Sequence, residues 1–279
     1  MAPTSSSSTN QQLRYKPPLT QLVNLLKTQQ FYWFLGHVFA VLFFILNTLT
    51  SFFNPRSSLG YYKFALASII LTYGIVIKQV HFKTNFTISR RLLRDENVQY
   101  LLLASIFLIA SFKIGQIHSS LYSFEIFAVF HILTYFQNQL LGVFISNIRA
   151  QQRLNSIINN FTTKFNQPAL FAASNSEIIL LLICGFNLIP MFLLLIFRRN
   201  FIDFAIHLFL FGSIVVFNKL RFDSNQYTKV VVEQMDAKVN QILLQLNNAN
   251  LLNLYTNVKN QAIVYLNKIQ IPKEQIKKN

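Results

Sequence analysis

Six apolar stretches, each about as long as a helix that crosses a bilayer, constrain this sequence more than any other feature. They cover about residues 31–53, 59–80, 98–118, 121–145, 178–197 and 201–217. A helix of about 20 residues, rising about 1.5 Å per residue, spans a hydrocarbon core of about 30 Å. We therefore predict an all-α, multi-pass helical membrane protein with four to six membrane segments, some of them paired as hairpins.

The composition supports a membrane protein. Only 12% of the 279 residues are charged, against roughly 25% in ordinary soluble domains. The formal net charge of +16 calls for an acidic partner or surface. Because the basic residues punctuate apolar runs instead of clustering on one polar domain, we expect a lipid bilayer, in part anionic, as the partner and no direct nucleic acid contact.

The third and fourth segments are the least regular. Lys113 lies inside the third, and the fourth contains Glu125, His131 and a polar run at 137–139. These two segments either span the bilayer or form a re-entrant hairpin. The break at 198–200, between the fifth and sixth segments, is so short that we predict a tight hairpin there.

The distribution of Lys and Arg predicts the orientation. If all six segments cross, eleven basic residues lie before the first segment and in the connections on that side, five lie on the other side, and nine follow the last segment on the side of the eleven. Both termini are then cytosolic. The glycosylation sequons that begin at Asn85 and Asn160 would also face the cytosol and should carry no glycan.

Three regions follow from these patterns. Residues 1–18 are predicted to be a disordered cytosolic tail, 19–218 a helical membrane domain, and 219–279 a basic amphipathic C-terminal region. Within the membrane domain, apolar residues recur at steps of three and four over 149–165. This spacing predicts an interfacial helix that ends before Pro168.

The C-terminal region contains two helical series of apolar residues, separated by a polar interruption at 247–250. The polar face of the second helix is mostly uncharged Asn, so its binding to lipid must rely on apolar insertion, which favours curved membrane. The alternative is a helix packed against the membrane bundle or a partner helix. The predicted membrane-binding residues are Leu251, Leu252, Tyr255, Val258, Tyr265, Leu266 and Ile269.

No catalytic, cofactor-binding or metal-binding pattern is visible. No two of the five histidines have metal-ligand spacing, and phosphate loops and the G-x-S-x-G turn are missing from the sequence. We therefore expect no enzyme and no cofactor. Ionisable residues in or near membrane segments favour a small transporter or channel of the endoplasmic reticulum as the alternative function, and these are Lys113, Glu125, His131, Glu177 and Asp203. We prefer a simpler interpretation, which pairs Lys113 with Glu125 across a hairpin turn and places Glu177 and Asp203 at segment ends in the headgroup zone.

Several short motifs resemble the transmembrane protein thirty-three family of the endoplasmic reticulum and nuclear envelope, whose fungal branch comprises pore-membrane nucleoporins. The motifs are the run at 91–96 that leads into Tyr100, His131-x-x-Thr134-Tyr135, the run at 175–178, and the run at 220–222 followed by Tyr227. The family-motif residues are Asp95, Tyr100, His131, Tyr135, Glu177, Arg221 and Tyr227.

The resemblance implies a non-enzymatic protein that shapes or scaffolds curved membrane and contributes to nuclear pore complex assembly, distribution or stability. The implied partners are nuclear pore membrane components and reticulon-type proteins that shape the endoplasmic reticulum. It also implies an importin-type karyopherin, bound through the basic C-terminal region.

Overall fold

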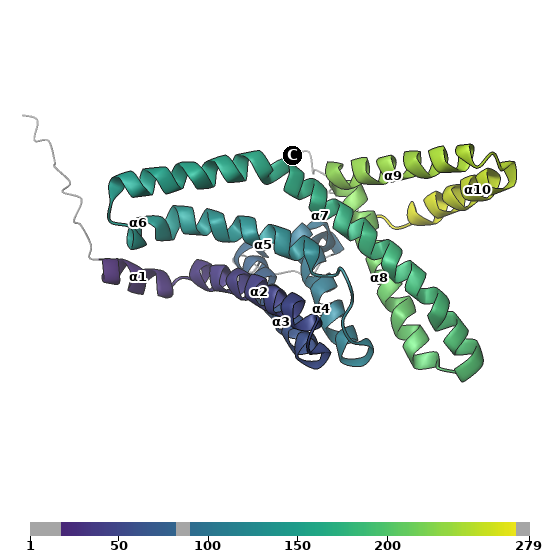
Figure 1. Ribbon diagram of the computed structural model, residues 1–279, viewed down its shortest axis with the longest axis horizontal. Helices are drawn as coiled ribbons and strands as arrows, with labels where there is room; N and C mark the ends of the chain where they lie inside the picture. The colour runs from purple at the N-terminus through teal and green to yellow at the C-terminus, as the bar shows by residue number, and fades with distance from the viewer. Residues whose placement is uncertain (1–17, 82–89, 272–279) are drawn as a thin grey trace, which may run out of the picture.

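The computed structural model describes residues 18–81 and 90–271, and within these ranges the chain is helical with no strand (Figure 1). Most of the predicted tail at 1–18, and the sequon at Asn85, lie outside the described residues. The helices are α1 (Pro18–Leu26), α2 (Gln29–Ser51), α3 (Pro55–His81), α4 (Glu96–Ile114), α5 (Tyr122–Tyr135), α6 (Leu141–Phe144), α7 (Ile148–Arg198), α8 (Phe201–Ser224), α9 (Gln226–Gln245) and α10 (Ala249–Leu266).

Six helical segments in the described ranges are long and apolar enough to cross a membrane. They are α2, α3, α4, the continuous stretch Tyr122–Phe144, α7 and α8. Both α4 and the Tyr122–Phe144 stretch satisfy this criterion, so the two irregular segments are each long enough to span. The structure confirms an all-α, multi-pass membrane protein.

Short polar side chains start most of these helices. Thr28, Asp95, Asn147, Asn200, Asn225 and Asn248 each stand before a helix and accept a hydrogen bond from a backbone N–H of its first turn. Such caps satisfy N–H groups that have no partner within the helix, and each contributes about 1 kcal/mol. The asparagines that interrupt the apolar pattern therefore mark where helices begin.

Three helix turns lie at one end of the molecule (Figure 1). At the turn between α2 and α3, the Asn47 amide donates to Ser58 at 2.8 Å and to Gln116, which follows α4, at 3.1 Å. At the end of α4, Lys113 lies 3.9 Å from Asp203 in the first turn of α8. The α2–α3, α4–α5 and α7–α8 turns therefore face the same side of the bundle, as alternating crossings require.

The core lies between α2, α3, α4, α5, α7 and α8. It is built from buried aromatic and aliphatic side chains, among them Tyr62, Leu66, Tyr73, Phe107, Phe124, Cys184 and Ile214. Outward-facing positions on the same helices remain apolar, and Ile109, Phe112 and Phe186 are about 70% exposed. A helix that is apolar on all faces is typical of a membrane span, where lipid covers the outer face.

Helix α7 corrects one prediction from the sequence. The helix expected to end before Pro168 runs on as a single 51-residue helix through both Pro168 and Pro190. A proline inside a helix removes one hydrogen bond and usually bends the helix without ending it when packing supports both sides. Figure 1 shows α7 changing direction partway along, so that its first part lies beside α5 and its last part beside α8.

Two segment ends also differ from the prediction. Helix α4 ends at Ile114, short of residue 118, because Gly115 adopts φ 82° and stops the helix. Helix α8 continues past Phe217 to Ser224, so the helix of the last membrane segment extends into the predicted basic region.

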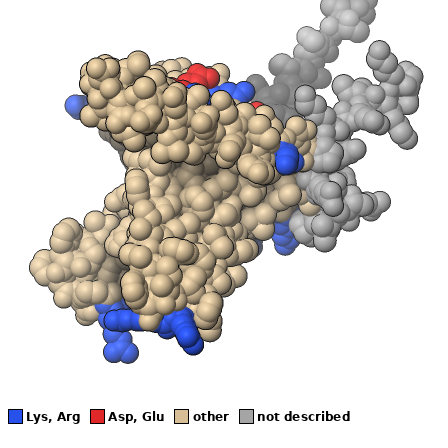
Figure 2. All heavy atoms as spheres, turned by 90° about the vertical axis from the view of Figure 1, so that its right-hand side faces the viewer, with Lys and Arg blue, Asp and Glu red and all other residues tan. Residues whose placement is uncertain are grey.

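Figure 2 views the molecule from the side where the α7–α8 turn and the α9–α10 hairpin project. Basic atoms gather at the lower tip and both basic and acidic atoms at the top, and most of the surface between them is uncharged, apart from a few basic atoms at the right edge. The surface is hollowed between the upper and lower parts. This pattern is typical of a membrane protein whose charged ends lie at the two bilayer surfaces.

Candidate functional site

The clearest polar constellation lies where α4, α7 and α8 meet. The Arg221 guanidinium lies 2.7 Å from Glu96 and 3.5 Å from Glu177, and the Tyr100 hydroxyl donates to Glu177 Oε1 at 2.5 Å. The Arg221 guanidinium also stands over the Tyr100 ring, 5.3 Å from its centre. Arg221 and Glu177 are each only 2% exposed. We call Glu96, Tyr100, Glu177 and Arg221 the buried ion cluster.

Neighbouring residues hold the buried ion cluster in place. The Tyr73 ring of α3 stacks on Tyr100 with centres 5.5 Å apart, and the Asn218 amide donates to the backbone of Glu177. Asp95, the residue before α4, accepts from the Asn97 N–H at 2.8 Å and lies 2.7 Å from His81 at the end of α3. Burial raises the pKa of Asp95, but these hydrogen bonds outweigh it and hold the pKa below its usual value.

His131 and Tyr135 form a second cluster with α2. The His131 ring lies 5.0 Å from the Trp33 ring and 4.8 Å from the His37 ring, and Tyr135 stacks on Phe34 at 4.7 Å. Aromatic pairs at such distances contribute about 0.5–1.5 kcal/mol each beyond their buried area. These two motif residues therefore fix α5 against α2.

The structure thus brings together three of the seven family-motif residues, Tyr100, Glu177 and Arg221. Asp95 lies close to them in sequence, and His131 and Tyr135 belong to the second cluster. Tyr227 is half-buried at the start of α9, where its backbone N–H donates to Asn225. Sequence reasoning missed Glu96 and Tyr73. Glu96 lies within the quoted motif at 91–96, whereas nothing in the sequence distinguishes Tyr73 from other aromatic residues of its segment.

The residues considered for transport do not form one path. Lys113 pairs with Asp203, so the predicted pairing with Glu125 across the turn is wrong. Glu177 is buried beside Arg221, which balances its charge near the start of α4 and the end of α8. His131 packs on aromatic rings. Glu125 is buried, and its carboxylate has no hydrogen-bond partner among the described residues.

The buried ion cluster has a structural role, because it joins helices α4, α7 and α8. Its three innermost side chains are almost inaccessible, which leaves no space for a substrate beside them. Across residues 18–81 and 90–271, no group of three or more His, Cys, Asp or Glu side chains is placed to hold a metal ion. The arrangement therefore joins helices without presenting a nucleophile, an acid or a base to a ligand.

The basic C-terminal region forms an antiparallel hairpin of α9 and α10 (Figure 1). Asn247 has φ 47° at the turn, and Asn248 caps α10. Asp236 of α9 accepts from the Tyr255 hydroxyl and from Lys259, both at 2.7 Å. The hydrogen bonds from Lys259 and Tyr255 hold the pKa of Asp236 below its usual value, and burial together with the Asp236 carboxylate raises the pKa of Tyr255 to about 12.

The hairpin divides the predicted membrane-binding residues into two groups. Leu252, Tyr255 and Leu266 are half-buried, and Tyr255 contacts α9 directly. Leu251, Val258 and Tyr265 are between 42% and 65% exposed. Ile269 is half-buried and lies beyond the end of α10. The exposed apolar surface of the hairpin also includes Ile242, Leu246 and Leu254.

The near end of the hairpin is anchored on the bundle, and the far end is not. Thr228 and Val231 of α9 are buried, and the Thr228 hydroxyl lies 3.3 Å from the Ser174 hydroxyl of α7. Beyond Val231, no residue of α9 or α10 is fully buried. After α10, the backbone carbonyl of Ile271 accepts from Arg94 at 2.9 Å.

Comparison with known proteins finds relatives over most of the chain. The profile of the family described as Transmembrane protein 33/Nucleoporin POM33 matches residues 15–269. A Saccharomyces cerevisiae protein named Pore and endoplasmic reticulum protein of 33 kDa is 35% identical over 238 residues, 80% of this chain and 86% of the relative. The Pore membrane protein of 33 kDa of the same yeast is 26% identical over 82% of this chain and 80% of the relative. Nucleoporin POM33 of Chaetomium thermophilum is 27% identical over 81% of this chain and 82% of the relative.

No solved structure matches the chain significantly. The family profile covers all six membrane segments, the buried ion cluster and both helices of the C-terminal hairpin. The chain belongs to the Transmembrane protein 33/Nucleoporin POM33 family.

Proposed function

We propose that this protein shapes or scaffolds the membrane of the nuclear envelope and endoplasmic reticulum and contributes to the assembly, distribution or stability of nuclear pore complexes. The names of its relatives, which refer to pores, to pore membrane and to endoplasmic reticulum, support this location. The α9–α10 hairpin supports the mechanism, because it presents apolar side chains outside the six membrane segments. The protein acts without catalysis or cofactor.

The exposed apolar residues of the hairpin are the observation that carries this proposal. Leu254, Val258 and Tyr265 are each at least 57% exposed. Removing apolar area from water stabilises by roughly 25 cal/mol per Å², so the headgroup region of a bilayer is the favoured environment for these side chains. Lipid-packing gaps are more frequent where the bilayer curves, and binding through them makes the hairpin prefer curved membrane.

The shape of the bundle favours the same curvature. The excess of basic residues on one side supports a cytosolic location of both termini. Figure 1 shows the molecule broad at the end where α9, α10 and the first part of α7 lie, and narrower at the end of the three helix turns. A protein that occupies more area in the cytosolic leaflet than in the lumenal leaflet biases the membrane toward positive curvature.

Three kinds of partner follow from this proposal. The bilayer, in part anionic, balances the net positive charge. Nuclear pore membrane components and reticulon-type proteins share the curved membrane. An importin-type karyopherin binds the basic C-terminal region, which carries nine Lys and Arg against four acidic residues from Lys219 onward.

The proposal is tested with the full-length protein in giant vesicles from which a narrow membrane tube is drawn. We expect the fluorescently labelled protein to be enriched in the tube relative to the flat vesicle membrane. The double substitution Leu254→Asp and Val258→Asp should abolish this enrichment, because it places two charges on the apolar surface.

The matched control is Asn253→Asp with Asn257→Asp, which adds the same two charges at exposed polar positions of the same helix. This control should retain the enrichment. Equal density of the unaltered protein in tube and vesicle, or equal loss in both double variants, would contradict the proposed mechanism.

A further inference from the structure

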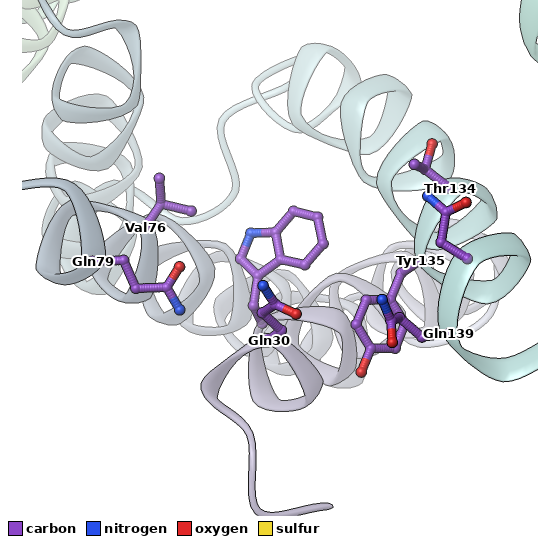
Figure 3. A pocket seen from close by; sticks show the side chains of 8 residues that line it. Gln30, Val76, Gln79, Thr134, Tyr135 and Gln139 are labelled. Carbon is purple, nitrogen blue, oxygen red and sulfur yellow. The ribbon is translucent and has the colours of Figure 1, made fainter. Parts of the chain in front are cut away.

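A pocket with both apolar and carboxamide side chains in its lining opens where the first turn of α2 meets the ends of α3 and α5. Its volume is about 320 Å³. Figure 3 shows Gln30 in the middle, Val76 and Gln79 of α3 on one side, and Thr134, Tyr135 and Gln139 on the other. Trp33 and Asn138 complete the lining. Neither the buried ion cluster nor the α9–α10 hairpin contributes to it.

The lining is rich in carboxamides and carries no charge. Gln30, Gln79, Asn138 and Gln139 supply four carboxamide groups. Among the described residues, only Gln79 of these four bonds another side chain, donating to Gln29 at 3.4 Å. Each carboxamide offers both a donor and an acceptor. A ligand group with many hydroxyls, each also a donor and an acceptor, complements such a lining, whereas a buried phosphate would have no opposite charge within it.

Rings form the apolar part of the pocket. Trp33 lines the pocket, and its ring centre lies 6.5 Å from that of Tyr135. An aromatic face packs well against the C–H face of a saturated ring. Together with the carboxamides, it indicates a cyclic polyol as the ligand.

A local irregularity of the helix contributes two of the carboxamides. Directly after Tyr135, residues Phe136–Leu140 form a π-helical turn, and Asn138 and Gln139 belong to it. Single π turns inside α-helices are rare and frequently mark functional sites. The structure thus departs from regular helix geometry at the polar run of the fourth segment.

The place of the pocket indicates that the polyol belongs to a lipid. The pocket lies at the helix ends, next to Thr28, which caps α2, and the apolar part of the spans begins immediately beyond it. Two exposed lysines, Lys27 and Lys78, flank Gln30 and Gln79 in sequence. Their charge suits a phosphodiester placed outside the uncharged pocket. We propose that this pocket binds the inositol ring of phosphatidylinositol.

The protein carries its own reporter of binding, because Trp33 is its only tryptophan. The full-length protein in phosphatidylcholine nanodiscs is titrated with phosphatidylinositol or with phosphatidylserine, which has the same net charge. We expect a saturable change of Trp33 fluorescence with phosphatidylinositol alone. An equal response to phosphatidylserine would overturn the proposal. A response to free myo-inositol in discs without phosphatidylinositol would overturn the assignment to a lipid.

Substitutions locate the site. Gln30 and Gln139 are exposed and make no hydrogen bond to another described side chain, so Gln30→Ala with Gln139→Ala should leave the fold intact. We expect the apparent affinity for phosphatidylinositol to fall about tenfold, equivalent to about 1.4 kcal/mol. The control, Gln234→Ala with Gln241→Ala, removes two exposed carboxamides of α9 and should bind normally. Unchanged affinity of the pocket variant, or an equal loss in the control, would refute the site.

Discussion

Replacing Arg221 with methionine should destabilise the packing of α8 on α4 and α7. Arg221 is almost fully buried and is the cation nearest to Glu177, which is equally buried. Methionine fills much of the same space but leaves the Glu177 carboxylate without a positive partner. Removing one member of a buried ion pair typically costs about 3–5 kcal/mol, because the remaining charge stays desolvated.

The double substitution Glu177→Gln with Arg221→Met separates charge from packing. It removes the two buried charges and leaves only the Glu96 carboxylate, which is 46% exposed, without its partner. It also keeps an acceptor for the Tyr100 hydroxyl, which donates to Glu177 in the native protein. Replacing both members of a buried pair by neutral side chains is often close to neutral. The double variant should therefore recover most of the stability that Arg221→Met loses.

Cys184 provides the assay, because it is the only cysteine and is buried in the core that α4, α7 and α8 share. The rate at which a maleimide reacts with the Cys184 thiol in nanodiscs reports how often this core opens. Since about 1.4 kcal/mol corresponds to a factor of ten, Arg221→Met should accelerate the reaction about a hundredfold or more.

Arg198→Met is the matched control, because Arg198 is exposed at the end of α7 and makes no ion pair with another described residue. It should react at the native rate. Native-like labelling of Arg221→Met, or a double variant that reacts as fast as the single one, would refute the role given to the buried ion cluster.

Three further predictions follow from other contacts. Gly36→Ala should lower the thermal unfolding midpoint in detergent, because the new Cβ would lie 2.5 Å from the buried Thr72 methyl. We expect a loss of about 1–3 kcal/mol in the free energy of unfolding. In the control, Gly212→Ala, the new Cβ meets no atom within 4 Å, so this variant should be nearly neutral. The Asp236 carboxylate stabilises the hairpin fully at a pH above 3.8, the ordinary pKa of this carboxyl group. This stabilisation is lost as the pH falls through the lower pKa that Asp236 has in the folded protein. Hydrogen exchange of α10, corrected for intrinsic rates, should therefore show less protection at low pH than at pH 6, and Asp236→Asn should remove this difference. Finally, glycosidase treatment should not change the electrophoretic mobility of the protein, and a glycan on Asn160 would contradict the cytosolic placement of the first part of α7.

The membrane segments could be predicted from the sequence because apolar length is a local property. A run of about 20 apolar residues has few other stable environments, and this holds without knowledge of neighbouring helices. The tight α7–α8 hairpin followed from chain length alone, since only Arg199 and Asn200 separate the two helices.

Other features depend on contacts between distant parts of the chain. Because proline disfavours helical geometry in the residue before it, the sequence predicted a helix end before Pro168. The helix continues because the first part of α7 packs along α5, where the Phe161 ring lies beside the Phe130 ring. Lys113 pairs with Asp203, a residue 90 positions away, in place of the nearby Glu125. Three residues of the buried ion cluster, Tyr100, Glu177 and Arg221, were identified from short motifs, but their meeting depends on how three helices pack.

The C-terminal region has some features that follow from local sequence and others that depend on contacts between helices. The helical period of α9 and α10 was predictable, but which residues of α10 face α9 was not, because that is decided by Asp236 and its two partners, Tyr255 and Lys259. The residues predicted to insert into membrane therefore divide between the inner and outer faces of the hairpin. Leu251, Val258 and Tyr265 are the ones that the structure leaves exposed.

Two-colour imaging tests the proposed function most directly. The tagged full-length protein is compared with a nuclear pore marker and with a chain that ends at Gln226, where α9 begins. We predict that the full-length protein forms nuclear-rim puncta that coincide with the pores, and that the shortened chain loses this coincidence while remaining in the membrane. A uniform reticular signal that does not change on shortening would contradict both the pore-membrane function and the role of the α9–α10 hairpin.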